Sequence, residues 1–257
     1  MNERSQRERE IYNKGIANEW KEYSSRFGHA NLGYEPDQYR KLFDLHMAGA
    51  KSKDVLEIGS TAWENLDLVN NSPRNVTCIN ISEKFLQKGK DLYNELNPST
   101  NIDFVLMDAN KLEFADNSFD VVFGIGILHH LDFETAIKEI HRVLKNGGFC
   151  CFSEPLIGNP IGKIVRKRTP EVRTPDEKPL GKQEITVLNN YFEVDYLFRQ
   201  LFYVPAGVIS AKLTKTPYNP LMKSSYLLDN FLGKYGPHWF KLLYRYVYFI
   251  AKCNKPA

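Results

Sequence analysis

Short apolar runs alternate with amphipathic stretches from residue 54 onward, and this alternation limits the chain to few folds. The runs "DVLEI", "NVTCINI", "IDFVLM", "FDVVFGIGI" and "GFCCFSE" are rich in Val, Ile and Phe. Strands joined by crossover helices give this pattern, which predicts a mostly parallel sheet with helices on both faces. A chain of 257 residues, 42% of them hydrophobic, can bury one sizeable core. We therefore expect an α/β fold.

The clearest helix is predicted after Asp132. Apolar residues recur there at helical spacing from Phe133 to Leu144, with Asp132 as N-cap and Gly147 closing the helix. Two more strand-like runs, at 191–204 and 244–252, flank an aromatic segment that reads as helical. Residues 155–185, which precede both runs, hold five prolines and no strand period, so an ordered excursion or lid is expected there.

The first fifty residues have a different sequence pattern. Aromatic residues recur at spacings that suit short helices, with breaks at Gly28, Gly33 and Pro36. We expect residues 1–50 to form an N-terminal helical lid and residues 51–257 to form the main domain. Tyr23 to His29 would then cover one side of a site.

The composition limits the kinds of partner and the cellular location that we expect. A net charge of +3 without a long basic run argues against nucleic acid. Four cysteines without CxxC spacing suggest buried free thiols in a reducing compartment, and the charged N-terminus does not resemble a signal peptide. No apolar run reaches membrane-spanning length, so a cytoplasmic protein is expected. The C-terminal stretch "HWFKLLYRYVYFIA" reads as core helix and edge strand.

Polar side chains cluster where the predicted strands end. Glu57 and Gly59 end the first strand, and a helix beginning near Ala62 would point its N-terminus at this edge. Asn80 ends the second strand, Asp108 the third, and "GIGILHHL" the fourth. Ligands of open parallel sheets bind at the carboxyl ends of the strands, so a ligand site is expected here.

The series "VLEIG", "INISEKFL" and "FVLMDANKLEFADNSFDVVFGIGILHHLDFETAIKEIHRVLKNGGFCCFSEP" resembles class I S-adenosylmethionine-dependent methyltransferases, in particular the group that includes quinone and sterol methyltransferases. The resemblance covers about residues 53–155. It implies a Rossmann-like seven-stranded sheet whose last strand is antiparallel. It also implies S-adenosylmethionine as cofactor, S-adenosylhomocysteine as product and a small-molecule acceptor.

The resemblance also assigns residues to the cofactor. Glu57 and Gly59 would line its methionine end, with Ser60 supplying polar groups beside them. Asn80 would lie at the ribose and Ile81 against the adenine face. Asp108 with the Ala109 amide would meet the adenine edge, and the backbone from Gly124 to Gly126 would meet the amino-acid portion.

Two departures from the family pattern bear on the cofactor. The second and third glycines of its glycine-rich turn are Thr61 and Trp63 here, although such positions favour residues without a side chain. The acidic residue expected at the ribose is Asn80, a change that should cost on the order of 1 to 2 kcal/mol, or about tenfold in affinity. We expect a modified but working site.

Proton transfer from a hydroxyl acceptor would need a base near the ends of strands four and five. The candidates are His129, His130 and Glu154, while His141 is expected to be structural. No metal site is expected. The excursion from Lys163 to Lys182 holds seven basic and three acidic residues, and its Arg and Lys side chains could meet a phosphate or carboxylate of the acceptor.

Three functions stay open. The first is methyl transfer to an oxygen of a polar or anionic metabolite, such as a sugar, a sugar phosphate or a natural-product intermediate. The second keeps the fold but performs other chemistry, as a cyclase or hydratase would. The third is a non-catalytic binding partner with a decayed cofactor site, which Trp63 filling the cofactor space would indicate. The sequence leaves the oligomeric state open.

Overall fold

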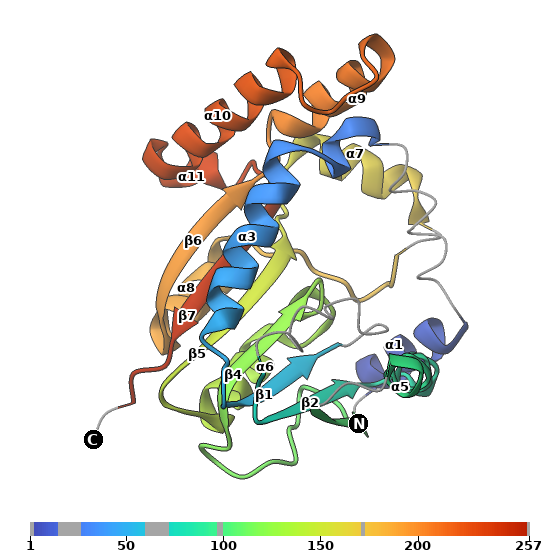
Figure 1. The fold of residues 1–257 in the computed structure, drawn as a ribbon, viewed down its shortest axis with the longest axis vertical. Coiled ribbons are helices and arrows are strands. Elements are labelled where there is room, and N and C mark those ends of the chain that lie inside the picture. Colours follow the sequence, from blue (N-terminus) through green and yellow to red (C-terminus); the bar gives the residue numbers. More distant parts are fainter. Residues whose placement is uncertain (1–2, 15–26, 60–71, 97–99, 171–172, 256–257) are drawn as a thin grey trace.

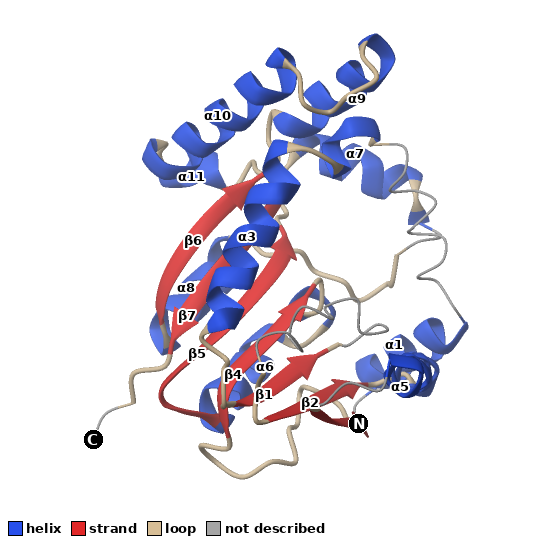
Figure 2. Ribbon diagram, viewed as in Figure 1, coloured by secondary structure: helices blue, strands red, loops and turns tan. Residues whose placement is uncertain are grey.

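A seven-stranded mixed sheet forms the centre of the molecule (Figures 1 and 2). The computed structural model describes residues 3–14, 27–59, 72–96, 100–170 and 173–255. The strand order is β3-β2-β1-β4-β5-β7-β6, and β7 alone runs antiparallel to its two neighbours. The strands are β1 (Asp54–Ile58), β2 (Asn75–Asn80), β3 (Asn101–Leu106), β4 (Phe119–Ile125), β5 (Leu144–Pro155), β6 (Glu193–Arg199) and β7 (Tyr246–Lys252). The expected α/β fold with an antiparallel last strand is confirmed.

Helices cover both faces of the sheet, as the apolar strands require. On one face, Phe43 and Met47 of α3 (Tyr34–Ala48) and Leu92 of α5 (Glu83–Leu96) pack in one apolar cluster with Val121 and Cys151 of the sheet. A second cluster joins the other face to α6 (Phe133–Val143) and α8 (Lys182–Tyr191). The remaining helices are α1 (Glu3–Lys14), η1 (Gly28–Asn31), η2 (Leu128–His130), α7 (Pro160–Arg168), α9 (Tyr203–Leu213), α10 (Pro220–Tyr235) and α11 (His238–Lys241).

Helix α6 forms as its apolar period predicts. Ala136, Ile137, Ile140 and Val143 are buried, and the Asp132 carboxylate accepts a hydrogen bond from the Thr135 amide at 3.0 Å. The expected closure at Gly147 is wrong, because the helix ends at Val143 and β5 begins at the next residue. Leu144 pairs with Phe119 in the sheet, so the chain passes from helix to strand without a glycine turn.

Several boundaries differ from those expected from sequence. Strand β3 ends at Leu106, two residues before Asp108. The strand expected over 191–204 is β6 alone, because Tyr203 already begins α9. Strand β7 is not at the edge: it lies between β5 and β6, and α11 before it has no buried residue. The order of strands depends on pairing between distant segments, which local sequence patterns do not contain.

The N-terminal region and the excursion are more helical than expected. Pro36 does not break α3 but lies in its first turn, where the missing N–H costs little. The excursion contains α7, whose N-cap Asn159 accepts a hydrogen bond from the Gly162 amide, and its end passes into α8. All four cysteines are free and buried, as expected. Among the helices that the structure describes, none has the length and apolarity needed to span a bilayer.

The N-cap of α6 can be tested by substitution. Asp132→Ala removes the acceptor for the Thr135 amide and is expected to cost about 1 kcal/mol of stability. The melting temperature should fall by about 2 to 4 °C. Asp132→Asn keeps an oxygen at the same place and serves as the matched control, with melting close to that of the wild type. Equal melting of the two variants would show that the cap does not stabilise the helix.

Candidate functional site

Two cavities meet at the carboxyl ends of the central strands. The smaller, about 70 Å³, lies over the ends of β1, β2 and β3, and we call it the strand-end cleft. The larger, about 450 Å³, extends from β4 and β5 toward α7, β6 and the segment before β7, and we call it the arginine-lined cavity. Both cavities are lined by Tyr12, Ile125, Gly126 and His130. The two cavities therefore adjoin at these residues.

The strand-end cleft brings together most of the residues assigned to the cofactor. Its lining includes the predicted residues Gly59, Asn80, Ile81, Asp108, Ala109 and Gly126. Apolar side chains of Ile58, Ile79 and Met107 complete the floor. Ser60, Thr61 and Trp63 lie outside the described residues, as does the helix expected near Ala62.

Two predicted cofactor residues lie outside this lining. Glu57 is 5% exposed and accepts a hydrogen bond from the Cys78 thiol at 3.2 Å, within the sheet. Gly124 is required by packing, since a Cβ there would lie 2.7 Å from Ile127 Cγ2 and 2.8 Å from the Ile58 carbonyl oxygen. Glu57 and Gly124 therefore contribute to the packing of the strand ends.

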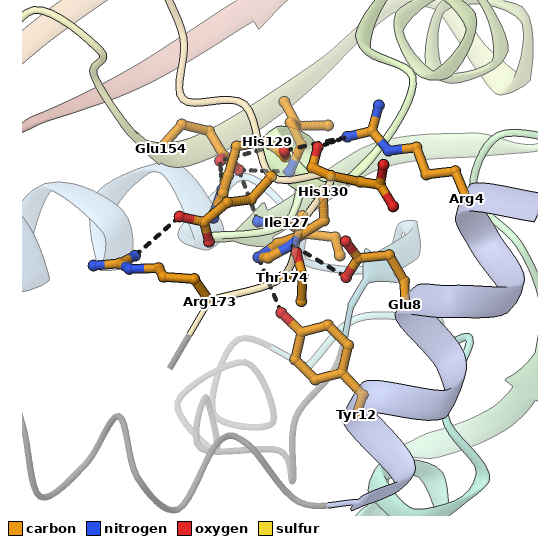
Figure 3. A network of polar contacts seen from close by, with 12 residues as sticks. Arg4, Glu8, Tyr12, Ile127, His129, His130, Glu154, Arg173 and Thr174 are labelled. Carbon is orange, nitrogen blue, oxygen red and sulfur yellow. Dashed lines mark hydrogen bonds and ion pairs between the residues drawn. The ribbon is translucent and has the colours of Figure 1, made fainter. Parts of the chain in front are cut away.

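Glu154, near the end of β5, holds the turn that follows β4 (Figure 3). Its Oε1 accepts hydrogen bonds from the Ile127 and Leu128 amides at 2.9 Å. Its Oε2 lies 2.7 Å from His129 Nδ1 and accepts from the His129 amide at 3.3 Å. The side chain is fully buried and lines neither cavity, so the role in direct proton transfer expected from sequence changes to a positioning role.

His129 is the partner that reaches the arginine-lined cavity. Because Nδ1 faces Glu154, Nε2 is the nitrogen left for a ligand. Burial, followed by the charges of Arg166 and Arg173, lowers the pKa of His129 to about 3. Burial raises the pKa of Glu154 to about 7, against the opposing effect of the backbone amides. The two groups act as one buried pair that takes up a proton near pH 7.

His130 lines both cavities and lies among Tyr12, Glu8 and Thr174 (Figure 3). Its Nε2 lies 2.9 Å from the Tyr12 hydroxyl, and its Nδ1 lies 3.1 Å from Thr174 Oγ1. Burial and the neighbouring His129 lower the pKa of His130, so the ring is uncharged near neutral pH. His130 thus joins α1 to the excursion.

Among the described residues, four arginines and one carboxylate, Glu177, line the larger cavity; the arginines are Arg166, Arg173, Arg199 and Arg245. Arg173 pairs with Glu177 at 3.3 Å, and Arg199 pairs with Glu35. Arg245 lies over the Phe27 ring, with its guanidinium carbon 4.1 Å from the ring centre. Within the described part of the chain, Arg166 and Arg245 have no carboxylate at ion-pair distance. Burial and the charge of Arg173 lower the pKa of Arg166, which marks a site with excess positive charge.

Sequence reasoning missed several lining residues. Ser5, Glu8 and Tyr12 of α1 line the cleft from above, and their i, i+3, i+7 spacing was a usable signal of one helix face. Arg199 ends β6 and Arg245 directly precedes β7, and the antiparallel pairing of these strands brings them together. His141 contacts the rings of Tyr191 and Phe192, as expected for a structural histidine.

A possible cation site was also not expected. Ligand atoms of His129, His130 and Glu177 lie within 4.8 Å of one another. Nδ1 of His129 and both nitrogens of His130 already have polar partners, and Glu177 pairs with Arg173. The geometry therefore fits a hydrogen-bonded network between α1 and the excursion.

A family of known proteins matches the central part of the chain. A family described as "Methyltransferase domain" matches residues 56–152, from β1 through most of β5. The methyl donor of that family is S-adenosylmethionine, which leaves as S-adenosylhomocysteine. The matched residues contain the described strand ends that line the cleft.

Two curated relatives each match about half of the chain. The demethylmenaquinone methyltransferase of Staphylococcus haemolyticus is 37% identical over 128 residues, covering 48% of this chain and 52% of that protein. The ubiquinone/menaquinone biosynthesis C-methyltransferase of Pseudomonas entomophila is 35% identical over 135 residues, covering 49% and 51%. The chain thus spans about half the length of the curated relatives it matches.

The fold is shared more widely. The crystal structure of the [4+2]-cyclase SpnF superposes with a TM-score of 0.56 at 21% identity, covering 83% of this chain and 80% of that one. This likeness shows the fold alone.

Gly59 allows a direct test of the turn after β1. Its φ is +78°, and an added Cβ would lie 2.7 Å from Ile127 Cγ1. Gly147 has the same φ, but a Cβ there would have open space around it. Gly147→Ala should therefore cost about 1 to 2 kcal/mol for backbone strain alone, whereas Gly59→Ala should lose a further 1 to 3 kcal/mol, roughly, through overpacking. Urea unfolding measures both losses, and equal values would refute the close contact.

Proposed function

We propose that this chain, which belongs to the class I S-adenosylmethionine-dependent methyltransferases, transfers a methyl group to an oxygen of a small anionic acceptor. The cofactor would occupy the strand-end cleft, and the acceptor would occupy the arginine-lined cavity. The observation that carries the proposal is the contact of the two cavities at Tyr12, Ile125, Gly126 and His130. Such a contact lets donor and acceptor meet in line, which is the main requirement of this displacement.

The charge of the larger cavity supports an anionic acceptor. Arginine guanidinium groups present forked donors that match carboxylate and phosphate oxygens. Arg166 and Arg173 come from the excursion, as the basic composition of that segment suggested, and Arg199 and Arg245 face them from the sheet end. A phosphate or carboxylate would offset the positive charge that these side chains concentrate. The volume of about 450 Å³ suits a small metabolite.

The pair of His129 and Glu154 supports proton removal from a hydroxyl. Glu154 would accept Nδ1–H, which leaves Nε2 unprotonated and able to take the hydroxyl proton. The bound cofactor supplies an electrophilic methyl group. As the acceptor oxygen bonds to this carbon, the carbon–sulfur bond breaks and its electron pair stays on sulfur. Glu154 then stabilises the imidazolium without touching the acceptor.

A panel of acceptors tests the proposal. Hydroxylated phosphates and carboxylates, their neutral analogues and hydroquinones are incubated with the protein and with cofactor carrying a ¹³C-methyl group. Release of S-adenosylhomocysteine identifies the acceptor, and the carbon chemical shift of the product identifies the methylated atom. We expect an O-methyl signal with an anionic acceptor. Failure of every acceptor to release S-adenosylhomocysteine would defeat the proposal.

Methylation at carbon is the second candidate, and the printed name of the Pseudomonas relative favours it. A phenol or enol carbon becomes nucleophilic when its hydroxyl loses a proton, so the same histidine would serve. A C-methyl signal with a hydroquinone would favour this candidate over transfer to oxygen.

The pH dependence follows from the buried pair. The base is the deprotonated pair, which forms as pH rises through about 7, so kcat/KM should rise through this range and fall below it. Glu154→Gln keeps an oxygen for the backbone amides but removes this ionisation. It should lower kcat by roughly 10² to 10⁴ and flatten the pH profile.

Glu184→Gln is the control for this variant. Glu184 is also buried, but it caps α8 and lines neither cavity. It should keep the wild-type rate and pH profile. A Glu154→Gln enzyme that retains the wild-type pH dependence would exclude the pair as the base.

Arg166 tests the preference for anions. Pyrophosphate is titrated calorimetrically into protein saturated with S-adenosylhomocysteine. Arg166→Met should weaken pyrophosphate binding about tenfold or more, because a charge-assisted contact is lost. Lys167→Met removes the same charge from an exposed position of α7 and should bind as the wild type does. Equal pyrophosphate affinity in the wild type and both variants would contradict an anion site at Arg166.

A further inference from the structure

Helix α1 lines the strand-end cleft, and its Glu8 and Tyr12 side chains point toward His130 (Figure 3). At one side, the Arg7 guanidinium donates to both carboxylate oxygens of Asp176 at 2.8 and 3.0 Å. At the other side, Arg9 and Asn13 bond to Glu83 at the start of α5. These contacts place one face of α1 over the cleft, and the residues of this face that line it are Ser5, Glu8 and Tyr12.

Glu8 is a buried carboxylate without a hydrogen bond. It is 4% exposed, and within the described residues neither of its side-chain oxygens has a hydrogen-bond partner. The ionisable group at ion-pair distance from Glu8 is His130, whose Nδ1 lies 3.3 Å from Glu8 Oε2. Burial and the neighbouring His129 lower the pKa of His130, against the opposing effect of Glu8. A buried carboxylate in this state is costly, which points to a ligand that completes it.

Asn80 has no carboxylate, whereas both carboxylate oxygens of Glu8 are without a hydrogen-bond partner within the described residues. It ends β2, and its Oδ1 accepts a hydrogen bond from the Ser82 amide at 2.8 Å. An Asp at this position would have a second carboxylate oxygen for the ribose hydroxyls, but the second atom of Asn is an NH₂ donor. Asn80 and Glu8 line the same cleft.

We propose that Glu8 accepts hydrogen bonds from the ribose hydroxyls of the cofactor and so supplies, from α1, the charge that position 80 lacks. This inference rests on the proposed function, because it assumes that the cleft holds an adenosyl cofactor. The N-terminal helix then belongs to the binding site itself. Cofactor binding and the docking of α1 stabilise each other as a consequence.

Calorimetric titration of the full chain tests the assignment. S-adenosylmethionine, S-adenosylhomocysteine and 5′-methylthioadenosine are titrated into the wild type and into Glu8→Gln. All three carry the ribose hydroxyls, so all three should bind about tenfold more weakly to the variant. Glu10→Gln changes the same charge on an exposed position of α1 and should bind like the wild type.

The melting temperature of the ligand-free variant distinguishes a loss of binding contacts from a loss of stability. Glu8→Gln removes a buried charge, so the ligand-free variant should melt at or above the wild-type temperature. Weak binding together with a melting temperature well below that of the wild type would count against a direct contact. A loss confined to S-adenosylmethionine would show that Glu8 pairs with the sulfonium and would overturn the ribose assignment.

Restoring the missing carboxylate completes the test. Asn80→Asp in the Glu8→Gln background should return the affinity for S-adenosylhomocysteine to within about threefold of the wild type. A double variant as weak as Glu8→Gln would contradict the exchange of roles. If the wild type binds none of the three ligands, the proposed function fails. If it binds them and Glu8→Gln binds equally well, only this inference fails.

Discussion

The carboxylate of Glu154 is the constraint on which the site depends. This carboxylate, near the end of β5, accepts hydrogen bonds from the amides of the turn after β4 and lies 2.7 Å from Nδ1 of His129. This turn carries Gly126 and His130, which line both cavities. One buried charge therefore sets the path of the backbone, the orientation of the histidine and the place where donor and acceptor would meet. Its burial is what raises its own pKa and couples it to His129.

The cover of the site is assembled from distant parts of the chain. Helix α1 and the excursion meet where Arg7 pairs with Asp176 and where Tyr12 and Thr174 bond to His130. Several of the paired side chains are partly exposed, and such pairs contribute little to stability individually. A roof held in this way can separate from the strand ends at modest cost, which a cofactor enclosed beneath α1 would require. Tight enclosure and exchange of the cofactor are then compatible.

The sequence predicted what local periodicity determines. The strands with β-branched runs and the helix behind Asp132 follow directly from residue spacing. The strand-end position of Asn80 and Asp108 follows from the same reasoning, within two residues. Residue spacing did not predict contacts between distant segments. The interior place of β7, the burial of Glu154 beneath a turn 25 residues away and the meeting of Arg199 with Arg166 depend on tertiary pairing, which spacing along the chain does not encode.

The missing glycines of the turn after β1 predict an altered but working cofactor site, and this stays a prediction because Thr61 and Trp63 lie outside the described residues. Gly59 keeps its positive φ, and most of the assigned lining residues surround one cleft. A crystal grown with S-adenosylhomocysteine tests this account most directly. It should show a nucleoside beneath α1 at the carboxyl ends of β1, β2 and β3. Protein side chains filling that space, with no nucleoside able to displace them, would contradict it.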